Sequence, residues 1–459
     1  MMIIDSSLKP DFRARGIARV YRKKQGNWIS ERLLVVLVVM FTYFSFDYLY
    51  CTHISPGNLY LGFVCRPPSF QYHVISLAFA VIPITFLPVR FSRPSDWAIT
   101  FLFLFSYLPT AFMVRHRPGD TSAVGLLCLL LIALVLLDVT RRLDTPSISR
   151  RMIQIPTFWP GRRIRTVKYT LLMLFIFLVP VYLWAGNFRI DLNWATIYDR
   201  RMDSREISIP FLGYLVSIGR SLVPVYSIYF FIKERDRKYL IILALTSLAI
   251  FSLDGTKTAL FIPAFLFFVS YMLVQGRSFS LIYLSLGILV LAAIIEVTLF
   301  HSGILSEILV RRIIAIPGFL NSVYWDFFSR NAKVLLTDSI GRIFIAPIYP
   351  TTAPFLIGAT YFGRTTMNAN TGIWMGGYAH FGVIGVFLMS VLAGLLLRVV
   401  DRYARGEQFL LLGSLTSAYF GIIWSEQMLH TSFLSGGVFY LLIILIIVTR
   451  HKHFSRTTH

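Results

Sequence analysis

Charged residues are scarce in this chain of 459 residues: only 14% are Asp, Glu, Lys or Arg, whereas 56% are apolar. Soluble globular proteins usually carry about 25% charged residues, so this composition argues strongly against a soluble fold. Cysteine is also rare, and no group of Cys, His, Asp and Glu has the spacing of a metal site. The absence of a Walker A loop, a GxGxxG fingerprint and a GxSxG elbow argues against an ATP-driven transporter and a serine hydrolase.

Long apolar runs dominate what is present. They recur from Leu33 to the C-terminus, mostly at ~15–25 residues, about the length that crosses ~30 Å of hydrocarbon as a helix. The sequence therefore predicts an all-α integral membrane protein with about twelve transmembrane helices. The expected spans are residues 33–52, 72–90, 97–114, 122–139, 169–186, 209–232, 239–253, 258–275, 279–300, 379–398, 408–425 and 433–449.

Lys and Arg are distributed unequally between the two sides of this topology, with 29 on one side and 14 on the other. The positive-inside rule then places both termini in the cytoplasm. The formal net charge of +22 lies in short patches between spans, as membrane topology requires, so no nucleic-acid partner is expected. The basic first segment lacks an apolar core followed by a cleavage site, so we interpret it as a retained arm rather than a signal peptide.

One outer loop is much longer than the others, with 78 residues between positions 301 and 378. A long loop between short connections usually carries function, and we expect partial helices at residues 304–319 and 323–336. The predicted organisation is a basic arm (1–32), nine spans (33–300), the periplasmic loop (301–378), three spans (379–449) and a cytoplasmic tail (450–459).

The outer side is richer in cations than the positive-inside rule requires. An anionic substrate explains this excess, because the planar guanidinium group matches phosphate oxygens and can hold a lipid-linked diphosphate at head-group depth. The alternative is that single arginines contact phospholipid head groups or neighbouring carboxylates. The densest group, all in the long loop, is Arg311, Arg312, Arg330, Arg342 and Arg364.

Two shorter outer segments also carry cations. In the link 254–257, Gly255 makes a turn and Lys257 lies at the start of the next helix, whose dipole favours anions; a plain turn capped by Asp254 is the alternative. Residues 198–201 combine an acid with two arginines; the alternative there is a self-neutralising solvated patch.

Other outer or intramembrane polar residues suggest specific contacts. Arg220 lies within an apolar span, where a lipid-facing charge would cost roughly 3 kcal/mol or more, so we expect it to face the bundle interior or a wet cavity. Glu296 is either its partner or an interfacial residue. Cys51 and Cys65 both fall on the outer side, 14 positions apart, which makes a disulfide plausible in an oxidising compartment.

Base-assisted transfer to a hydroxyl needs a carboxylate or an imidazole. Asp326 is the first candidate because it lies within the aromatic segment 324–328, and flat aromatic rings can pack against sugar rings. The alternative is that these rings form an interfacial belt. Further outward candidates are Asp254, Asp338, His380, Glu426 and His430.

Several of these segments, taken in order, resemble the Wzy-type oligosaccharide repeat-unit (O-antigen) polymerases. They are residues 198–201, 254–260, 312–318 with 324–328, and 368–372 with 378–382. The likeness covers roughly the second half of the chain plus the loop 187–208. The chain departs from the family at Gly376, near which many relatives carry an acidic residue, and at His380, where they carry asparagine.

The resemblance implies a GT-C-like, metal-independent, inverting glycosyltransferase without a cofactor in the bacterial inner membrane. Its implied substrate is an oligosaccharide repeat unit carried on undecaprenyl diphosphate, and the growing chain is transferred to a new unit at the periplasmic face. The expected partners are membrane lipids, a chain-length regulator and a repeat-unit flippase.

On this basis we assign roles to individual residues. Asp326 is the predicted catalytic base. The predicted diphosphate ligands are Arg201, Lys257, Arg311, Arg312 and Arg330, and the predicted substrate contacts are Tyr324, Trp325, Asn368, Asn370 and His380. An O-antigen ligase, which would use similar chemistry on another acceptor, remains an alternative. A flippase or other transporter is the second alternative. Such a protein should carry polar residues along a central path through the membrane, and only Arg220 strongly fits this expectation.

Overall fold

The computed structural model of the chain describes residues 28–67, 69–117, 122–143, 163–187, 209, 211–404 and 407–449. These residues form helices and no strand, which confirms the expected all-α fold. Most of the arm 1–32 and the tail 450–459 lie outside the described residues. The principal helices are α2 (Trp28–Leu49), α4 (Phe70–Val81), α5 (Asp96–Leu102), α6 (Leu108–Phe112), α7 (Ala123–Arg142), α9 (Arg163–Ala185), α11 (Leu212–Glu234), α12 (Lys238–Asp254), α13 (Thr258–Val274), α14 (Ser280–Phe300), α15 (Ile316–Arg330), α16 (Ala353–Phe362), α17 (Ile373–Tyr403), α18 (Glu407–Glu426), α19 (Leu429–Leu434) and α20 (Val438–Thr449).

Each of the expected spans contains a helix, but not every helix is long enough to cross a bilayer. Among the described residues, seven helices have the required length and apolar composition, and five further apolar helices have 10–17 residues. The chain is therefore compatible with a multi-pass membrane protein, while the count of twelve spans stays a prediction. The seven candidate spans are Ile29–Gly57, Ala123–Arg142, Ile164–Ala185, Leu212–Glu234, Ser280–Phe300, Ile373–Tyr403 and Phe409–Glu426.

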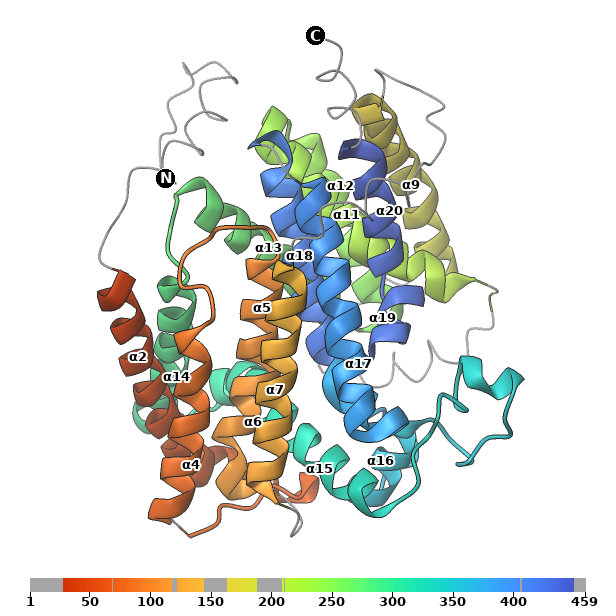
Figure 1. Cartoon of the computed structure of the whole chain (residues 1–459). Helices are drawn as coiled ribbons and strands as arrows, with labels where there is room; N and C mark the ends of the chain where they lie inside the picture. Colours follow the sequence, from red (N-terminus) through yellow and green to blue (C-terminus); the bar gives the residue numbers. More distant parts are fainter. Residues whose placement is uncertain are drawn as a thin grey trace.

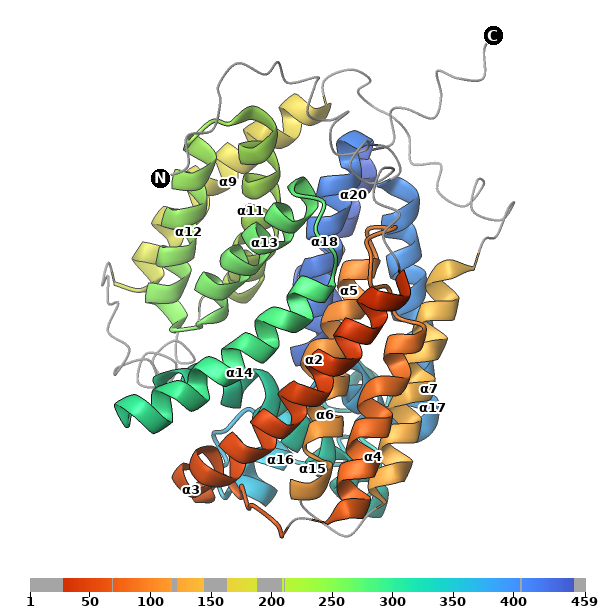
Figure 2. The same ribbon diagram turned by 90° about the vertical axis from the view of Figure 1, so that its left-hand side faces the viewer.

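The long helices pack side by side (Figure 1). Helix α17 packs along α7, α18 along α5 and α14 along α2, whereas α9, α11 and α12 pack on one another. Figure 2 shows this last group, with α13, beside α18. Helices α15 and α16 lie at one end of the molecule, which we call the outer end because both belong to the loop predicted on the outer side.

A buried charge cluster joins α5, α7 and α17. The side chain of Arg141 is fully buried, and its guanidinium group pairs with Asp96 at 2.8 Å and Asp138 at 2.6 Å. It also donates to the hydroxyl of Ser95, and Asp401 of α17 accepts from that hydroxyl at 2.6 Å. Because a buried charge is costly unless it is paired and hydrogen-bonded, these contacts fix the three helices relative to one another.

The long loop contains one continuous helical run, in which the π-helix η6 (Ser306–Ala315) passes directly into α15. The expected interruption between residues 319 and 323, and a second helix reaching residue 336, are therefore wrong. Asn321 lies in the expected gap, but its buried amide donates to Thr110 of α6 at 2.8 Å and accepts from Thr371 at 2.8 Å. The polar side chain is satisfied by tertiary contacts, so it does not end the helix.

Gly318 permits the close approach of α15 to α6. A Cβ atom at this position would clash with the backbone carbonyl of Pro109 and would lie 2.7 Å from Cγ of Met113. Backbone cannot give way as a flexible side-chain end can, so α15 packs here only because residue 318 has no side chain.

We expect Gly318→Ala to lower the midpoint of thermal unfolding in detergent, because overpacking a tight contact typically costs about 1–3 kcal/mol. Gly213→Ala is the matched control: nothing lies within 4 Å of its Cβ position, and alanine favours a helix over glycine. The control should unfold at the same or a higher temperature. Equal midpoints for the two variants would contradict the close helix contact.

Helix α17 consists of two pieces joined by non-helical residues. Gly382 has φ 63° and ψ −145°, a conformation that is essentially restricted to glycine. The break frees backbone carbonyls at the end of the first piece: Ala379 accepts from the N–H of Val334 at 2.9 Å and His380 from that of Leu335 at 3.2 Å. The first piece of α17 is thereby fastened to the turn that follows α15.

Candidate functional site

Arg220 organises the link between α12 and α13. Its Nη2 donates to Oδ2 of Asp254 at 2.6 Å and to the hydroxyl of Thr256 at 2.7 Å. Asp254 also accepts from the backbone N–H of Thr256 at 2.8 Å. The candidate pairing of Arg220 with Glu296 is wrong, since Glu296 instead accepts from the hydroxyl of Ser302 at 2.9 Å.

Cations from several elements converge around Glu426, the last residue of α18. Its carboxylate is within electrostatic range of both Arg220 and Arg312. Arg312 is exposed on η6, and Lys257, next in the chain to Thr256, lies half-buried at the start of α13. We refer to Arg220 and Arg312, together with the Lys257 that follows the Arg220-bound Thr256 in the chain, as the cation cluster; it includes two predicted diphosphate ligands.

Arg311, the residue before Arg312, makes a structural contact between two elements. Its Nη1 donates to the side-chain oxygen of Asn58 at 2.8 Å, and its Nε pairs with Glu307 at 2.8 Å. Asn58 follows the short helix α3 (Ser55–Gly57), so Arg311 fastens η6 to the outer end of the first helical segment. Arg311 thus holds two elements together, whereas Arg312 is the exposed residue of the pair.

Asp326 is buried, and both of its carboxylate oxygens have partners. Oδ1 accepts from Nη2 of Arg330 at 2.9 Å, and Oδ2 accepts from the hydroxyl of Tyr361 at 2.8 Å. Burial and the adjacent carboxylate raise the pKa of Tyr361, so its hydroxyl stays protonated as a donor. The predicted base thus links α15 to α16, while the guanidinium of Arg330 remains more than half exposed.

The predicted diphosphate ligands do not form one set. Arg312 and Arg330 are 18 positions apart in a continuous helical run, which corresponds to roughly 27 Å of helix and far exceeds the length of a diphosphate group. Arg201 lies outside the described residues. The placement of the described cations therefore favours the cation cluster, and not Arg330, as the site of a single diphosphate.

The aromatic segment divides into packing and accessible residues. Tyr324 is fully buried, and its hydroxyl donates to the carbonyl of Ala369 at 3.0 Å. Trp325 is partly exposed, and its ring lies 4.8 Å from that of Tyr378. The ammonium group of Lys333 lies 4.1 Å from the same Tyr378 ring, and burial lowers the pKa of Lys333. Trp325 is thus better placed than the buried Tyr324 and Tyr378 to contact a sugar.

The three remaining residues that were predicted to contact the substrate differ in exposure. Asn368 and Asn370 are exposed, whereas His380 is buried. The Nδ1 of His380 accepts from the N–H of residue 336 at 3.1 Å, and its Nε2 lies 3.2 Å from Sδ of Met428. The Met428 side chain also occupies the space that a Cβ on Gly376 would need. The departure from the polymerase pattern at Gly376 therefore has a steric reason.

Two polar atoms beside His380 have no hydrogen-bond partner among the described residues. They are Oδ1 of Asp338 and Nδ1 of His430, and both are buried. The other oxygen of Asp338 accepts from the N–H of Ala353 at 3.1 Å, and the rings of His380 and His430 lie 5.2 Å apart. Sequence patterns singled out these residues as outward candidates, but their convergence depends on the packing of three separate segments.

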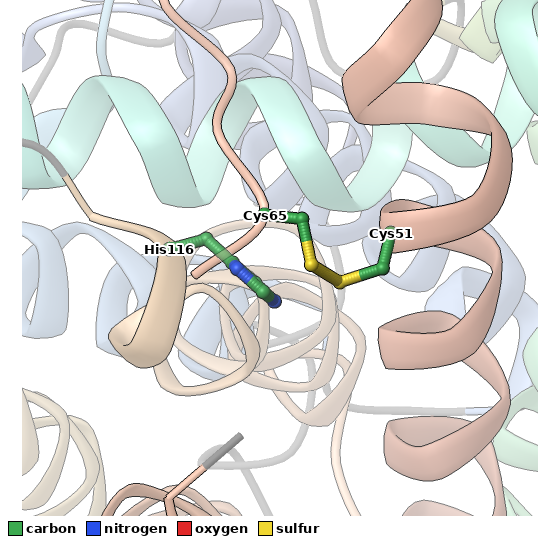
Figure 3. A group of neighbouring side chains, drawn as sticks. All are labelled: Cys51, Cys65 and His116. Carbon is green, nitrogen blue, oxygen red and sulfur yellow. A yellow bond between two sulfur atoms is a disulfide. The ribbon is translucent and has the colours of Figure 1, made fainter. Parts of the chain in front are cut away.

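A disulfide accounts for the single group of three possible metal ligands found in the described part of the chain, Cys51, Cys65 and His116. The two cysteines are bonded to each other (Figure 3), which confirms the expected bridge. The guanidinium of Arg115 lies 3.1 Å from Sγ of Cys51, and His116 pairs with Asp47 at 3.0 Å. Disulfide sulfurs carry no thiolate charge and a cation already lies beside them, so the group is a structural link and not a metal centre.

No family model, curated protein or solved structure is significantly similar to this chain. The resemblance to repeat-unit polymerases therefore rests on the sequence motifs. The structure adds the relative placement of those motifs: segments 254–257 and 312–318 contribute to the cation cluster, and segments 324–328 and 378–382 meet where Trp325 packs on Tyr378.

Proposed function

We propose that this protein polymerises lipid-linked oligosaccharide repeat units into surface polysaccharide at the outer face of the bacterial inner membrane. The observation that carries the proposal is the cation cluster: Arg220 of α11 and Arg312 of η6 lie near Glu426 at the end of α18, and Lys257 follows the Thr256 that Arg220 binds. Arginine and lysine beside apolar helices suit a diphosphate whose lipid tail lies against those helices.

The proposed reaction is an inverting glycosyl transfer. An acceptor hydroxyl oxygen attacks the anomeric carbon of the growing chain, and the bond from that carbon to the diphosphate oxygen breaks. The lipid diphosphate leaves with the bonding electron pair, and the acceptor proton passes to a base. The cation cluster stabilises the negative charge that develops on the leaving group.

The aromatic end of the site suits the sugars. Trp325 is partly exposed and packs on the buried ring of Tyr378, so it offers a surface on which a sugar ring can pack, and Lys333 over Tyr378 adds a cation. In this proposal Asp326, held by Arg330 and Tyr361, orients the acceptor. A GT-C-like organisation, a chain-length regulator and a repeat-unit flippase belong to the same proposal.

Transport is the main alternative from another class. The intramembrane charge that suggested a transport path, Arg220, is bound to Asp254 and Thr256 in a local network. This arrangement supports a fixed binding site more than a path through the bilayer. A ligase would use the same site chemistry and differs in its acceptor.

Deletion of the gene in its host, followed by gel analysis of the surface polysaccharide, tests the proposal. Loss of the polymerase should reduce the ladder to core carrying one repeat unit, and the wild-type gene should restore it. Loss of all attached units with accumulation of long lipid-linked polymer would identify a ligase. An unchanged ladder in a strain without a second polymerase would contradict the proposal.

A further inference from the structure

We propose that His430 accepts the proton of the acceptor hydroxyl and that Asp338 positions its imidazole ring. This inference rests on the proposed glycosyl transfer and assigns its base to a residue outside the polymerase-like motifs.

A base needs a lone pair that is free to receive a proton. Asp326 is buried and already accepts from Arg330 and Tyr361, and protonation of its carboxylate would weaken both hydrogen bonds. His380 is also engaged, since it accepts a backbone hydrogen bond at Nδ1 and contacts Met428 at Nε2. Protonation of either group would therefore weaken a contact that holds the fold.

His430 differs from both of these residues. Its Nδ1 is buried without a hydrogen-bond partner, whereas its Nε2 is not among the buried unpartnered atoms and makes no hydrogen bond to a described residue. The side chain as a whole is partly exposed. The ring therefore has a buried edge that needs a partner and an accessible edge that can reach a substrate hydroxyl.

Asp338 has a buried acceptor atom without a donor, and this matches the buried nitrogen of His430. Its Oδ1 is buried and unpartnered, and its carboxylate is within electrostatic range of both His430 and His380. Unpaired buried polar atoms are rare in proteins and indicate a functional contact or an unseen partner such as water. A hydrogen bond from Nδ1–H of His430 to Asp338, direct or through one water, would satisfy both atoms and leave Nε2 with a free lone pair.

The surroundings of His430 favour its neutral form. Burial lowers the pKa of His430, although the Asp338 carboxylate opposes this effect. Of the helices packed against α19, α17 contributes His380, α18 contributes Glu426, and α20 contributes no acidic or basic residue. Glu426 faces Arg220 and Arg312. The net effect favours the neutral ring, which is the form that a general base needs.

The same placement connects the base to the leaving group. Glu426 precedes His430 by four positions and lies within range of the cation cluster. In the proposed step, the acceptor proton moves to Nε2 of His430 as the acceptor oxygen bonds to the anomeric carbon and the lipid diphosphate departs. The resulting imidazolium, stabilised by Asp338, then releases its proton to water.

Chain extension by purified protein in proteoliposomes tests this assignment, with lipid-linked repeat units extracted from the deletion strain as the probe. We expect His430→Gln to slow extension on the order of 100-fold and to remove the loss of activity that wild type shows as the pH falls through the His430 pKa. Asp338→Asn should slow extension and shift this acid limb to lower pH, and Asp338→Glu should recover part of the rate.

His301→Asn is the matched control, because His301 is an exposed outer histidine with φ 51°, a conformation that asparagine tolerates. It should retain the wild-type rate and acid limb. Unfolding midpoints of all variants separate misfolding from lost chemistry. Wild-type rate and pH profile in folded His430→Gln would overturn the assignment, as would an acid limb that vanishes only in Glu426→Gln. Failure of wild type itself to extend chains would instead overturn the proposed function.

Discussion

Arg312→Ala is expected to leave surface polysaccharide at one repeat unit per core, as in the deletion strain, although the variant protein reaches the membrane in normal amount. Removing one preorganised donor from a developing charge typically costs about 100–1,000-fold in rate. Arg312 is exposed and within electrostatic range of Glu426, so its loss should affect the diphosphate more than the fold. Gel ladders and immunoblots of the complemented strain measure both quantities.

Two other arginines of the long loop provide controls for this prediction. Arg342→Ala changes an exposed arginine of the same loop and should restore the full ladder. Arg311→Ala removes the contacts to Asn58 and Glu307, so it should lower the unfolding midpoint of the purified protein. A full ladder with Arg312→Ala would exclude this residue from the site.

Arg141→Ala is expected to have the largest effect on folding. The change leaves the carboxylates of Asp96 and Asp138 buried without their shared counter-charge. Breaking a buried ion pair by removing one partner costs about 3–5 kcal/mol, a large part of the stability of an ordinary domain. We expect little folded protein after detergent extraction, measured as the monodisperse fraction in size-exclusion chromatography.

Arg142→Ala tests whether burial, and not charge alone, causes this effect. Arg142 pairs with the same Asp138 at 2.9 Å, but 44% of its side chain is exposed. Exposed pairs contribute about 0–1 kcal/mol, so this variant should be extracted like the wild type. Similar yields for Arg141→Ala and Arg142→Ala would contradict the structural role of the buried cluster.

Hydropathy was sufficient to locate the helices of the predicted spans, though not those of the long loop, because an apolar run in a bilayer would satisfy its backbone polar groups as a helix. It also placed Cys51 and Cys65 on the same predicted side, and the disulfide that this made plausible is present. The pairing of these two cysteines could be anticipated because the chain has only one other cysteine, Cys128, which is free. The exact number of spans was less accessible, because segments such as Phe70–Thr85 and Val438–Thr449 are apolar but short.

The site was only partly predictable because its contacts are tertiary. The motifs pointed to Arg312 and Lys257, but neither spacing nor composition indicates that Arg220 binds Asp254 and not Glu296. The same holds for Asp326, whose partner Tyr361 is 35 positions away. The break at Gly382 is equally hidden, since glycine in an apolar run is compatible with a continuous helix.

The most direct test of the proposed polymerisation uses purified wild-type protein, reconstituted in liposomes with lipid-linked repeat units extracted from the deletion strain. Mass spectrometry of the lipids should show units of two, three and more repeats, together with released undecaprenyl diphosphate in equal number to the new linkages. Folded protein that moves single units across the liposome membrane without lengthening them would contradict the polymerase assignment and identify a flippase.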